Sequence, residues 1–463
     1  MKHAALVILA GLFLCGAWAP KGSAQLVIDG HGSVGIGTAA PHSDVEVGMR
    51  DPFIAGSVSS TDLNGAFSVY VSGRYAYVAT ANACRLTVVD VTRPAFPEVV
   101  GSVEDTTNLC GGWSVHVSGR YAYVAAWSRN CLSVVDVSNP ALPAVAGSVV
   151  DATYLDHPES VYVSGRYAYV AAEYGDSLTV VDISDPTNPM VAGSVSDSTF
   201  LNGASCVYVL GRYAYVGAFY GDRLTVVDVS DPAHPAVAGG ASGTGFLSGA
   251  QSVYVSSPYA YVAATYVGSS MGHLTVVDVS DPTNPTVVGS VFDSTDLCDA
   301  TSVYVSGRYA YVTAYVGDRL AVVDVSDPTD PVIVGGVTDA STLSGAKSVF
   351  VSGRYAYVAA GNRLTVVDIA GMDVPAAHIG DLAAGTVEVS ENIHSANNLY
   401  ADGGLNAGPG GIKSDGPAAA ADVLRVTPRA TAPGSPQAGV LYIDSSDGNR
   451  LKVYDGSVWR SLW

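Results

Sequence analysis

Positive charges are scarce in this sequence. The 463 residues include 22 Lys and Arg against 42 Asp and Glu, which gives a formal net charge of −20, and the basic residues form no run. An acidic chain repels the phosphate backbone of nucleic acids and the surface of anionic membranes. The charge balance therefore argues against nucleic acid as a partner.

Helical spacing of apolar residues is also missing beyond the N-terminus. Val, Tyr and Thr runs alternate instead with Gly, Pro and Asp, which indicates an all-β protein. Apolar residues make up 48% of the chain and charged residues only 14%. We therefore expect an ordered chain with a large core rather than a disordered one.

Patterns of nucleophilic catalysis and of metal sites are absent too. The nine His residues are scattered, with no evident pairing to Ser or Cys. The cysteine spacing fits no zinc motif, and no acidic stretch matches an EF-hand loop. We predict no cofactor; Ca²⁺ held by clustered loop Asp side chains is the one ion left open.

The first 24 residues have the pattern of a secretory signal peptide. A short polar start precedes an apolar run at residues 4–19, and Gly22-Ser23-Ala24 offers small residues before a cleavage point. The run is shorter than the roughly 20 residues of a membrane span. A retained anchor and a lipid on Cys15 are the alternatives. We predict a secreted or cell-surface protein with no membrane span after signal cleavage.

A unit of 46 residues recurs seven times, with one longer step of 50. Each copy is marked by a turn Arg, which Pro replaces in the fifth copy. The markers are Arg74, Arg120, Arg166, Arg212, Pro258, Arg308 and Arg354. A repeat of roughly 40–50 residues in an all-β chain is typical of propeller blades. A parallel β-helix is the alternative, although its coils are usually shorter.

Each copy contains four predicted strands, here called a to d. In the third copy they cover residues 160–163, 167–171, 178–182 and 191–195. Ser164-Gly165 makes a tight turn between a and b, and a Pro-rich loop at residues 184–189 separates c from d. We predict an all-β fold, a seven-bladed β-propeller of four-stranded antiparallel blades, over residues 51–380.

The end of strand c carries a pentapeptide that points to a known family. It reads LTVVD from residues 86, 178, 224, 274 and 364, LSVVD from residue 132 and LAVVD from residue 320. The chain in this respect resembles the LVIVD-repeat family of secreted or surface propellers over residues 51–380. The resemblance implies a fold and a location but no reaction.

The two ends of the repeat region predict how the ring closes. Residues 51–58 copy the end of a unit but precede the first full copy, and the seventh copy lacks the SDPxxP loop. We predict that residues 53–58 complete the last blade beside residues 364–368. Residues 379–382 are the competing strand.

The turn Arg and the Asp that ends strand c are predicted to be structural. Seven identical carboxylates fit a repeated scaffold better than a unique catalytic site. Because a–b turns and c–d loops share one face, Asp is expected to cap the c–d turn, and the Arg is expected to bridge to this Asp or to the SDP loop. These residues are Asp90, Asp136, Asp182, Asp228, Asp278, Asp324 and Asp368.

The b–c and d–a loops share the opposite face and differ between copies, as binding loops on a rigid scaffold do. Aromatic side chains with acids between them would hold a sugar or a partner's loop. Packing of each aromatic under its own loop is the alternative. The candidate ligand-binding residues are Trp127, Tyr154, Asp156, His157, Glu159, Tyr174, Asp176, Phe219, Tyr220, Tyr266 and Tyr315.

Five cysteines remain after the predicted cleavage, so at least one thiol is left over. Export permits disulfides. Cys110 and Cys131 fall in loops of one blade on one face and are the predicted pair, with Cys84 as the alternative partner.

Short flanks adjoin the propeller. Residues 30–48 and the C-terminus, where SSDGN at 445–449 reads as a hairpin turn, resemble modules of phage tail fibres and similar surface proteins. Val-Glu-Val occurs on both sides of the propeller, so we predict pairing of residues 45–48 with 387–390. The expected divisions are a signal peptide 1–24, an N-terminal segment 25–50, the propeller 51–380, a Gly/Ala-rich linker 381–428 and a C-terminal β module 429–463.

These features favour an exported, non-catalytic binding or adhesion protein with a protein or glycan partner at a surface. Fibre modules often trimerise, so homo-oligomers through the flanks are left open. The alternative is a secreted polysaccharide hydrolase or lyase that uses loop acids such as Asp156 and Glu159. A third interpretation is a structural surface-layer or matrix protein without a small ligand.

Overall fold

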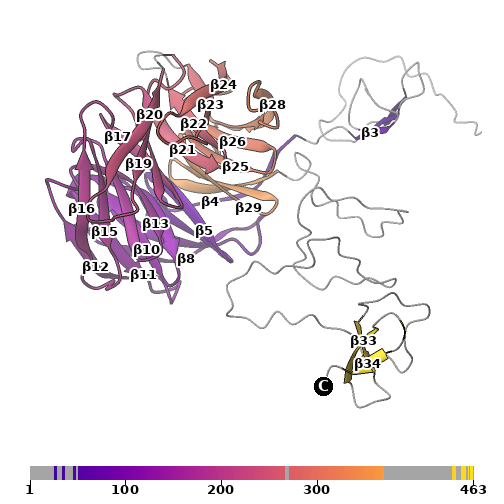
Figure 1. Ribbon diagram of the computed structural model, residues 1–463, viewed down its shortest axis with the longest axis horizontal. Helices are drawn as coiled ribbons and strands as arrows, with labels where there is room; N and C mark the ends of the chain where they lie inside the picture. Colours follow the sequence, from indigo (N-terminus) through magenta and orange to yellow (C-terminus); the bar gives the residue numbers. More distant parts are fainter. Residues whose placement is uncertain are drawn as a thin grey trace, which may run out of the picture. The chain divides into compact units, whose positions relative to one another are not determined.

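The computed structural model describes residues 26–28, 34–36, 45–47, 51–243, 245–265, 271–369, 441–444, 450–454, 457 and 459–461. Their main body is the predicted seven-bladed β-propeller (Figure 1). Every blade is a sheet of four antiparallel strands in the order a, b, c, d. The a strands of successive blades lie next to one another around the centre.

The strands of the blades follow the repeat in sequence. Blades 1 to 3 consist of β5 (Ala66–Ser72), β6 (Tyr75–Thr80), β7 (Arg85–Asp90), β8 (Glu98–Glu104); β9 (Gly112–Ser118), β10 (Tyr121–Ala126), β11 (Cys131–Asp136), β12 (Ala144–Val150); and β13 (Pro158–Ser164), β14 (Tyr167–Ala172), β15 (Ser177–Asp182), β16 (Met190–Ser196). Blades 4 to 6 consist of β17 (Ala204–Leu210), β18 (Tyr213–Ala218), β19 (Arg223–Asp228), β20 (Ala236–Ser242); β21 (Ala250–Ser256), β22 (Tyr259–Thr265), β23 (Gly272–Asp278), β24 (Thr286–Asp293); and β25 (Ala300–Ser306), β26 (Tyr309–Ala314), β27 (Arg319–Asp324), β28 (Val332–Thr338). Two single-turn 3₁₀ helices, η1 (Thr61–Leu63) and η2 (Trp127–Arg129), lie in loops.

Blade 7 is built from both ends of the repeat region. It contains β29 (Ala346–Ser352), β30 (Tyr355–Ala360), β31 (Arg363–Asp368) and the upstream strand β4 (Phe53–Ser59). The antiparallel register runs from Arg363 opposite Ser59 to Asp368 opposite Phe53. In Figure 1 the indigo to purple β4 lies beside the orange strands of this blade. The predicted closure is confirmed, and the competing residues 379–382 lie outside the described residues.

The core lies between neighbouring blades. Strand b repeats Tyr-Ala-Tyr, so two rings face one neighbour and a methyl group faces the other. Tyr123 of blade 2, for example, packs in one buried cluster with Ala168 and Val170 of blade 3. Large side chains thus meet small ones, as the repeat predicts, and each interface fills at interior density.

Hydrogen bonds also join the a strands of successive blades. The Ser Oγ in the middle of one a strand accepts the Val N–H of the next, as Ser114 does from Val161 at 3.1 Å. The pattern crosses the closure point, where Ser348 accepts from Val69 at 3.3 Å. Cys206 replaces this Ser in blade 4. These bonds tie the blades together at the centre, where each a strand meets its neighbours.

One glycine of strand d lets neighbouring blades approach closely. A Cβ on Gly147 would lie 2.6 Å from the carbonyl oxygen of Pro186, in the c–d loop of the next blade. Gly101 and Gly193 face the same clash at 2.3 and 2.5 Å. The recurrent Gly is therefore required by packing of the SDPxxP loop.

The Arg and Asp of the repeat meet on the face of the a–b turns and c–d loops, here called the turn face. In blade 3 the guanidinium of Arg166 binds the carboxylate of Asp182 and lies 5.2 Å from the ring centre of Tyr167. Asp182 Oδ1 also accepts the Ser184 N–H at 2.9 Å. Hydrogen bonds from Arg166 and then Ser184 lower the pKa of Asp182 to about 2.

The same bridge recurs wherever the repeat writes Arg. Asp278 of blade 5, which follows Pro258 instead, keeps only the cap to the Ser280 N–H, at 2.9 Å. Both structural predictions, the cap and the bridge, are confirmed. The other bridges are Arg74–Asp90, Arg120–Asp136, Arg212–Asp228, Arg308–Asp324 and Arg354–Asp368.

The flanks contain short strands. β1 (Leu26–Ile28), β2 (Val34–Ile36) and β3 (Val45–Val47) form one sheet, with β3 parallel to β2. Residues 387–390, the predicted partner of β3, lie outside the described residues, as do the signal peptide with Cys15 and the linker 381–428. The C-terminal strands β32 (Leu441–Asp444), β33 (Arg450–Tyr454) and β34 (Trp459–Ser461) form the predicted meander, with 445–449 between its first two strands.

Candidate functional site

Every blade has a β-bulge at the second residue of strand a. In blade 3 the register passes from Pro158 opposite Ala172 to Ser160 opposite Ala171, so Glu159 is the extra residue. A bulge re-aims its side chain, and bulges are frequent beside functional sites. The seven bulge residues, which we call the bulge ring, are Phe67, Trp113, Glu159, Ser205, Gln251, Thr301 and Lys347.

The bulge ring has seven different side chains at seven equivalent positions. Its neighbours in strand a are nearly constant, with Ser or Cys next and then Val. A second variable position follows strand b on the same face, which we call the loop tier. Its members are Ala81, Trp127, Glu173, Phe219, Thr265, Tyr315 and Gly361. We call the bulge ring and the loop tier together the mouth.

Below the mouth, aromatic rings close the centre of the propeller. They come from the fifth residue of each a strand and contact one another in a complete circle, with ring centroids 4.7 to 5.1 Å apart. Burial lowers the pKa of the one His among them, His116, to about 4. The seven residues are Tyr70, His116, Tyr162, Tyr208, Tyr254, Tyr304 and Phe350.

The mouth is asymmetric. On blades 4 to 6 three of its hydroxyl groups bond to the scaffold: Ser205 Oγ donates to the Ala250 carbonyl at 2.6 Å and Thr265 Oγ1 to the Ala300 carbonyl at 3.2 Å. Thr301 Oγ1 donates likewise to the carbonyl of Ala346 at 3.0 Å. On blades 7, 1 and 2 the bulge residues Lys347, Phe67 and Trp113 are large and contact one another in turn, whereas Glu159 of blade 3 interacts with Glu173 of the loop tier.

A chain of ring contacts crosses this side of the mouth. Trp113 stacks on Phe67 at 4.5 Å and on Trp127 at 5.1 Å between ring centres. Trp127 then meets His157 edge to face at 4.3 Å, and His157 contacts Tyr174 at 4.3 Å. Tyr174 is 56% exposed. The predicted Trp127, His157 and Tyr174 therefore come together on neighbouring blades.

Two carboxylates lie beside these rings. Glu173 is buried, and it accepts hydrogen bonds from Trp127 Nε1 at 3.1 Å and from the Tyr220 hydroxyl at 2.9 Å. Burial, then repulsion from Glu173, raises the pKa of Glu159 well above its usual range. The bond to Glu173 chiefly raises the pKa of Tyr220 to about 12. Phe219 packs edge to face on Tyr220, with ring centres 5.1 Å apart.

A cation sits between two rings on the other side of Phe67. Lys347 Nζ lies 3.8 Å from the ring centre of Tyr315 and 5.3 Å from that of Phe67. These distances are within the range of cation–π attraction. Lys347, Phe67, Trp113 and Tyr315 all line a hollow of about 770 Å³ above blades 7 and 1.

Three predicted residues have other roles or cannot be assessed. Asp176 caps a loop, since its Oδ1 accepts the Gly203 N–H at 2.8 Å. Tyr154 is 46% exposed, and its carbonyl accepts from Thr179. Tyr266 lies outside the described residues. Asp156 binds His157 Nδ1 at 2.7 Å and so supports the ring chain.

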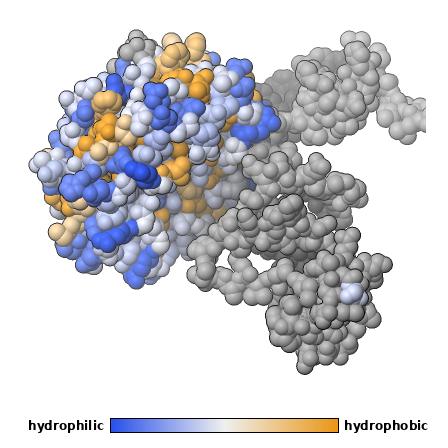
Figure 2. All heavy atoms as spheres, in the orientation of Figure 1, coloured by the Kyte–Doolittle hydropathy of each residue, from blue (hydrophilic) through white to orange (hydrophobic). Residues whose placement is uncertain are grey.

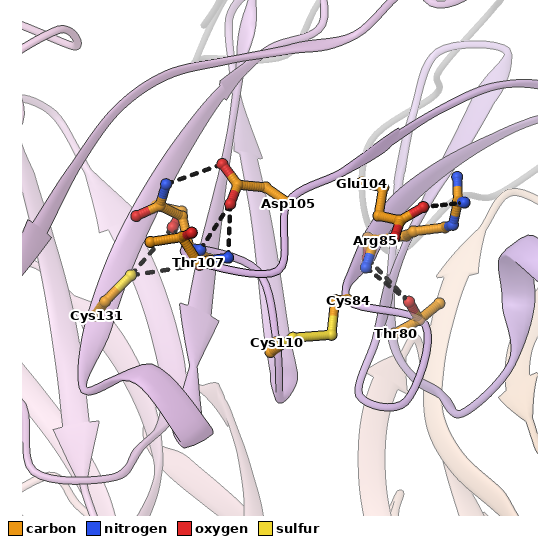
Figure 3. Close-up of a disulfide and its surroundings, with 10 residues drawn as sticks. Thr80, Cys84, Arg85, Glu104, Asp105, Thr107, Cys110 and Cys131 are labelled. Atoms are coloured by element: carbon orange, nitrogen blue, oxygen red, sulfur yellow. Dashed lines mark hydrogen bonds and ion pairs between the residues drawn. A yellow bond between two sulfur atoms is a disulfide. The ribbon is translucent and has the colours of Figure 1, made fainter.

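The disulfide differs from the predicted pair. Cys110 is bonded to Cys84, the alternative partner (Figure 3). Cys131 is buried and reduced, and its sulfur donates toward the Asn108 carbonyl at 3.4 Å. Cys84 has a left-handed φ of 53°. The equivalent position in blade 3 is Asp176, which caps its loop there. The bond thus joins the b–c loop of blade 1 to the d–a loop that follows.

Sequence reasoning missed Phe67, Trp113 and Lys347. These residues belong to the a strands β5, β9 and β29, whereas the variation between copies is most evident in the loops. Comparing the copies column by column would have found them, since the second residue of strand a is different in every copy. Within the described residues, no group of three or more His, Cys, Asp or Glu is arranged to hold a metal ion.

Solved structures show the same fold at low identity. The chain is similar to hydrazine synthase of Kuenenia stuttgartiensis (18% identity, TM-score 0.52, 69% of this chain and 99% of that chain). It is also similar to the β-propeller domain of Cps50 (Swd1) of Myceliophteria thermophila (13%, 0.52, 68% and 99%) and to virginiamycin B lyase of Staphylococcus aureus (6%, 0.53, 67% and 98%). These likenesses concern the fold alone.

No curated protein matches the chain. No helix among the described residues is long and apolar enough to cross a membrane. The family model of the LVIVD repeat matches seven times, at residues 65–105, 112–151, 157–197, 203–241, 249–293, 298–339 and 345–372, which is more than half of the chain. Each match covers most of one blade. The chain therefore belongs to the LVIVD-repeat family.

Proposed function

We propose that this protein is an exported, non-catalytic binding module whose mouth holds a glycan at a surface. A repeat propeller is an architecture suited to binding or scaffold roles, because variable side chains project from a rigid framework. The bulge ring carries the proposal. Seven equivalent positions hold seven different residues, whereas the adjoining positions repeat.

The chemistry of the mouth supports a glycan. Sugar sites need rigid, amphipathic contact surfaces and a few well-placed polar groups. The mouth supplies a stacked wall of Phe67, Trp113 and Trp127, with Tyr174 and Tyr220 exposed at its edge. Asn64 and Asn82 line the hollow beside that wall. A protein loop is the other partner that such a surface would accept.

The signal-like N-terminus supports export. An extracytoplasmic module with an acidic surface and a disulfide suits an oxidising compartment. Fractionation of the producing cells, with antibody against the propeller, tests this part of the proposal. Recovery of the protein with an intact N-terminus in the cytosol would contradict it.

A glycan screen with matched variants tests the binding proposal. The mature protein is applied to immobilised neutral and acidic glycans and to cell-surface preparations, and then repeated with Trp127→Ala, Tyr174→Ala and Phe219→Ala. We expect binding to weaken about tenfold or more for Trp127→Ala, as for loss of an aromatic anchor. Phe96→Ala is the matched control, because Phe96 is an aromatic residue of the turn face and 71% exposed.

The outcomes are distinct. Equal binding by all four variants would remove the mouth as the site. If the protein binds a cell-surface protein and this binding persists after the glycans have been removed, the partner is a protein and not a glycan. The surface of the propeller mixes apolar and hydrophilic residues (Figure 2), so the Phe96→Ala control also measures non-specific adhesion.

One observation favours a hydrolase as second candidate. Glu159 has its pKa raised by burial and by Glu173, which pairs a proton-holding acid with a second carboxylate. Glycosidases use two carboxyl groups in such unequal states. Release of reducing ends from polysaccharide that is abolished by Glu159→Gln, with binding retained, would establish this activity. No release by the unaltered protein would exclude it for the substrates tested.

A further inference from the structure

The hollow above blades 7 and 1 exists because the loop residues there are small. The loop tier has Ala81 and Gly361 at these blades, whereas the other five blades carry Trp, Glu, Phe, Thr or Tyr. The b–c loop of blade 7 is also short, with only Gly361 and Asn362 between β30 and β31. The space left is about 770 Å³, within the usual size of small-ligand sites.

The lining of the hollow is positive in an acidic protein. Lys347 and Arg363 line it, and none of its lining residues is Asp or Glu, although the chain has a net charge of −20. Anionic groups are attracted to such a local patch, and charge-assisted hydrogen bonds to Arg and Lys are among the strongest. The composition of the lining therefore selects against cationic ligands.

Arg363 lacks the acidic partner that Arg85 and Arg319 have at the same place in blades 1 and 6. Arg85, at the same place in blade 1, binds Glu104 on the paired strand and lies 3.6 Å from Asp62. In blade 7 the paired strand is the closing strand β4, and it places Ser59 opposite Arg363. Among the described residues Arg363 forms no ion pair. With Ser59 opposite it, this guanidinium has no carboxylate partner among the described residues and is available to a ligand.

Lys347 is held in place without a carboxylate at bonding distance among the described residues. The rings of Tyr315 and Phe67 flank its ammonium group, and Asp299 and Glu159 act on it only as more distant charges. Burial lowers the pKa of Lys347, because its ammonium group has lost hydration on folding. A bound anion would compensate that ammonium group for the lost hydration. Asn64, Asn82 and Asn362 add amide groups that bind hydroxyls.

We propose that the hollow binds a carboxylate-bearing sugar unit, a hexuronate, of the glycan. Lys347 and Arg363 bind the carboxylate, the Asn amides bind hydroxyl groups, and the edges of Phe67 and Trp113 contact the apolar face of the ring. This inference rests on the proposed glycan-binding function and names its ligand class. Phosphate or a free carboxylic acid shares the anionic group but not the hydroxyl pattern.

Titration of the mature full chain with defined sugars tests it. The probes are a galacturonic acid oligosaccharide and the galactose oligosaccharide of equal length, and calorimetry reports binding. We expect the acidic probe to bind at least about tenfold more tightly, because a charged hydrogen-bonded pair is lost with the neutral probe. The preference should shrink as salt is raised.

Matched variants locate the effect. Lys347→Met and Arg363→Gln should each lower the affinity for the acidic probe about tenfold and leave that for the neutral probe nearly unchanged. Arg93→Gln on the exposed turn face is the control. Thermal unfolding of each variant shows whether it has folded. If Lys347→Met does not fold, Arg363→Gln still tests the proposal, because Arg363 is near the surface.

The inference and the proposed function fail in different ways. Equal affinity for both probes, or an acidic-probe affinity that both variants retain, overturns the hexuronate site. If Trp127→Ala still weakens binding in that case, the glycan-binding function stands. Binding of acetate or phosphate as tightly as the acidic oligosaccharide also overturns it, as an anion site without sugar recognition. Failure of every sugar to bind overturns both.

Discussion

The turn face and the loop face of this propeller are made by the same seven repeats, yet they follow opposite rules. On the turn face, the Arg–Asp bridge recurs in six blades with the same partners. On the loop face, the bulge ring repeats no residue. A feature that is copied in six of seven blades serves the scaffold, whereas a feature that occurs once can define one site. This contrast is the basis for our proposal that the first face contributes stability and the second recognition.

Removing the closing strand should have the largest effect. A chain that lacks residues 51–59 leaves the edge of β31 unpaired and opens the ring. We expect loss of cooperative unfolding, because the change removes interactions comparable to the roughly 5–15 kcal/mol that stabilise a domain. Calorimetry measures it. A chain lacking residues 25–47 is the control, and equal unfolding of both truncated chains would contradict the closure.

Loss of the disulfide should come next. Cys84→Ser with Cys110→Ser removes a link between residues 26 apart, which is expected to cost about 3 kcal/mol. Chemical denaturation measures the change. Cys84→Asp with Cys110→Asn copies Asp176 and Asn202, which hold the equivalent positions in blade 3 and in the d–a loop after it, and should recover part of the loss. An unchanged denaturation midpoint in the double Ser variant would show that the link adds nothing.

Acid should weaken the turn face in a defined pH window. Asp136, Asp182 and Asp228 have pKa values lowered to about 2 by hydrogen bonds from the bound Arg and then from the side chain and N–H of a Ser, and Asp90 by those from Thr92 and then Arg74. When the pKa of a carboxyl group is lower in the folded chain than in the unfolded chain, its ionised form stabilises the fold. This contribution is fully present at pH values above the unfolded pKa near 3.8, and it is lost as the pH falls toward 2. Thermal unfolding between pH 5 and 2 should therefore show a falling Tm.

A single bridge should matter little on its own. Arg166 is 60% exposed, so Arg166→Gln is expected to lower Tm by roughly 2 °C or less at neutral pH. Asp182→Asn should flatten the acid-induced fall in Tm more than Asp278→Asn does, since Asp278 lacks an Arg partner. A larger effect at Asp278 would contradict the assigned cause.

The smallest effect on stability should come from the exposed tyrosines at the edge of the mouth. Tyr174 and Tyr220 are more than half exposed, so Tyr174→Ala and Tyr220→Phe should leave Tm within about 2 °C. Glycan binding should nevertheless fall for Tyr174→Ala. Scanning calorimetry checks stability, and a large loss of Tm with unchanged binding would reverse the division between the two faces.

The repeated part of the sequence was enough to predict the blades, the closing strand and the Arg–Asp bridges. These features depend on strand periodicity, turn residues and register, which are local and stated seven times. The site was predicted only in part. Trp127, His157 and Tyr174 were found, but the bulge residues Phe67 and Lys347 were not, because a one-residue register shift is invisible in a pattern of alternating residues.

The disulfide was also predicted only in part. Blade geometry placed Cys84, Cys110 and Cys131 on one face, but the choice among them depends on loop direction. Cys131 begins β11 and is buried there, whereas Cys84 ends its loop in a left-handed conformation that reaches Cys110. No spacing rule in the sequence distinguishes these two positions.

The most direct test of the division between the faces is a paired measurement of glycan affinity. One chain carries Trp127→Ala and Tyr174→Ala on the loop face, and the other carries Phe96→Ala and Leu142→Ala on the turn face, where both residues are more than 70% exposed. The account predicts that the first chain loses at least about tenfold in affinity while the second binds as the unaltered protein does. Loss of affinity in the second chain alone, or equal loss in both, would contradict it.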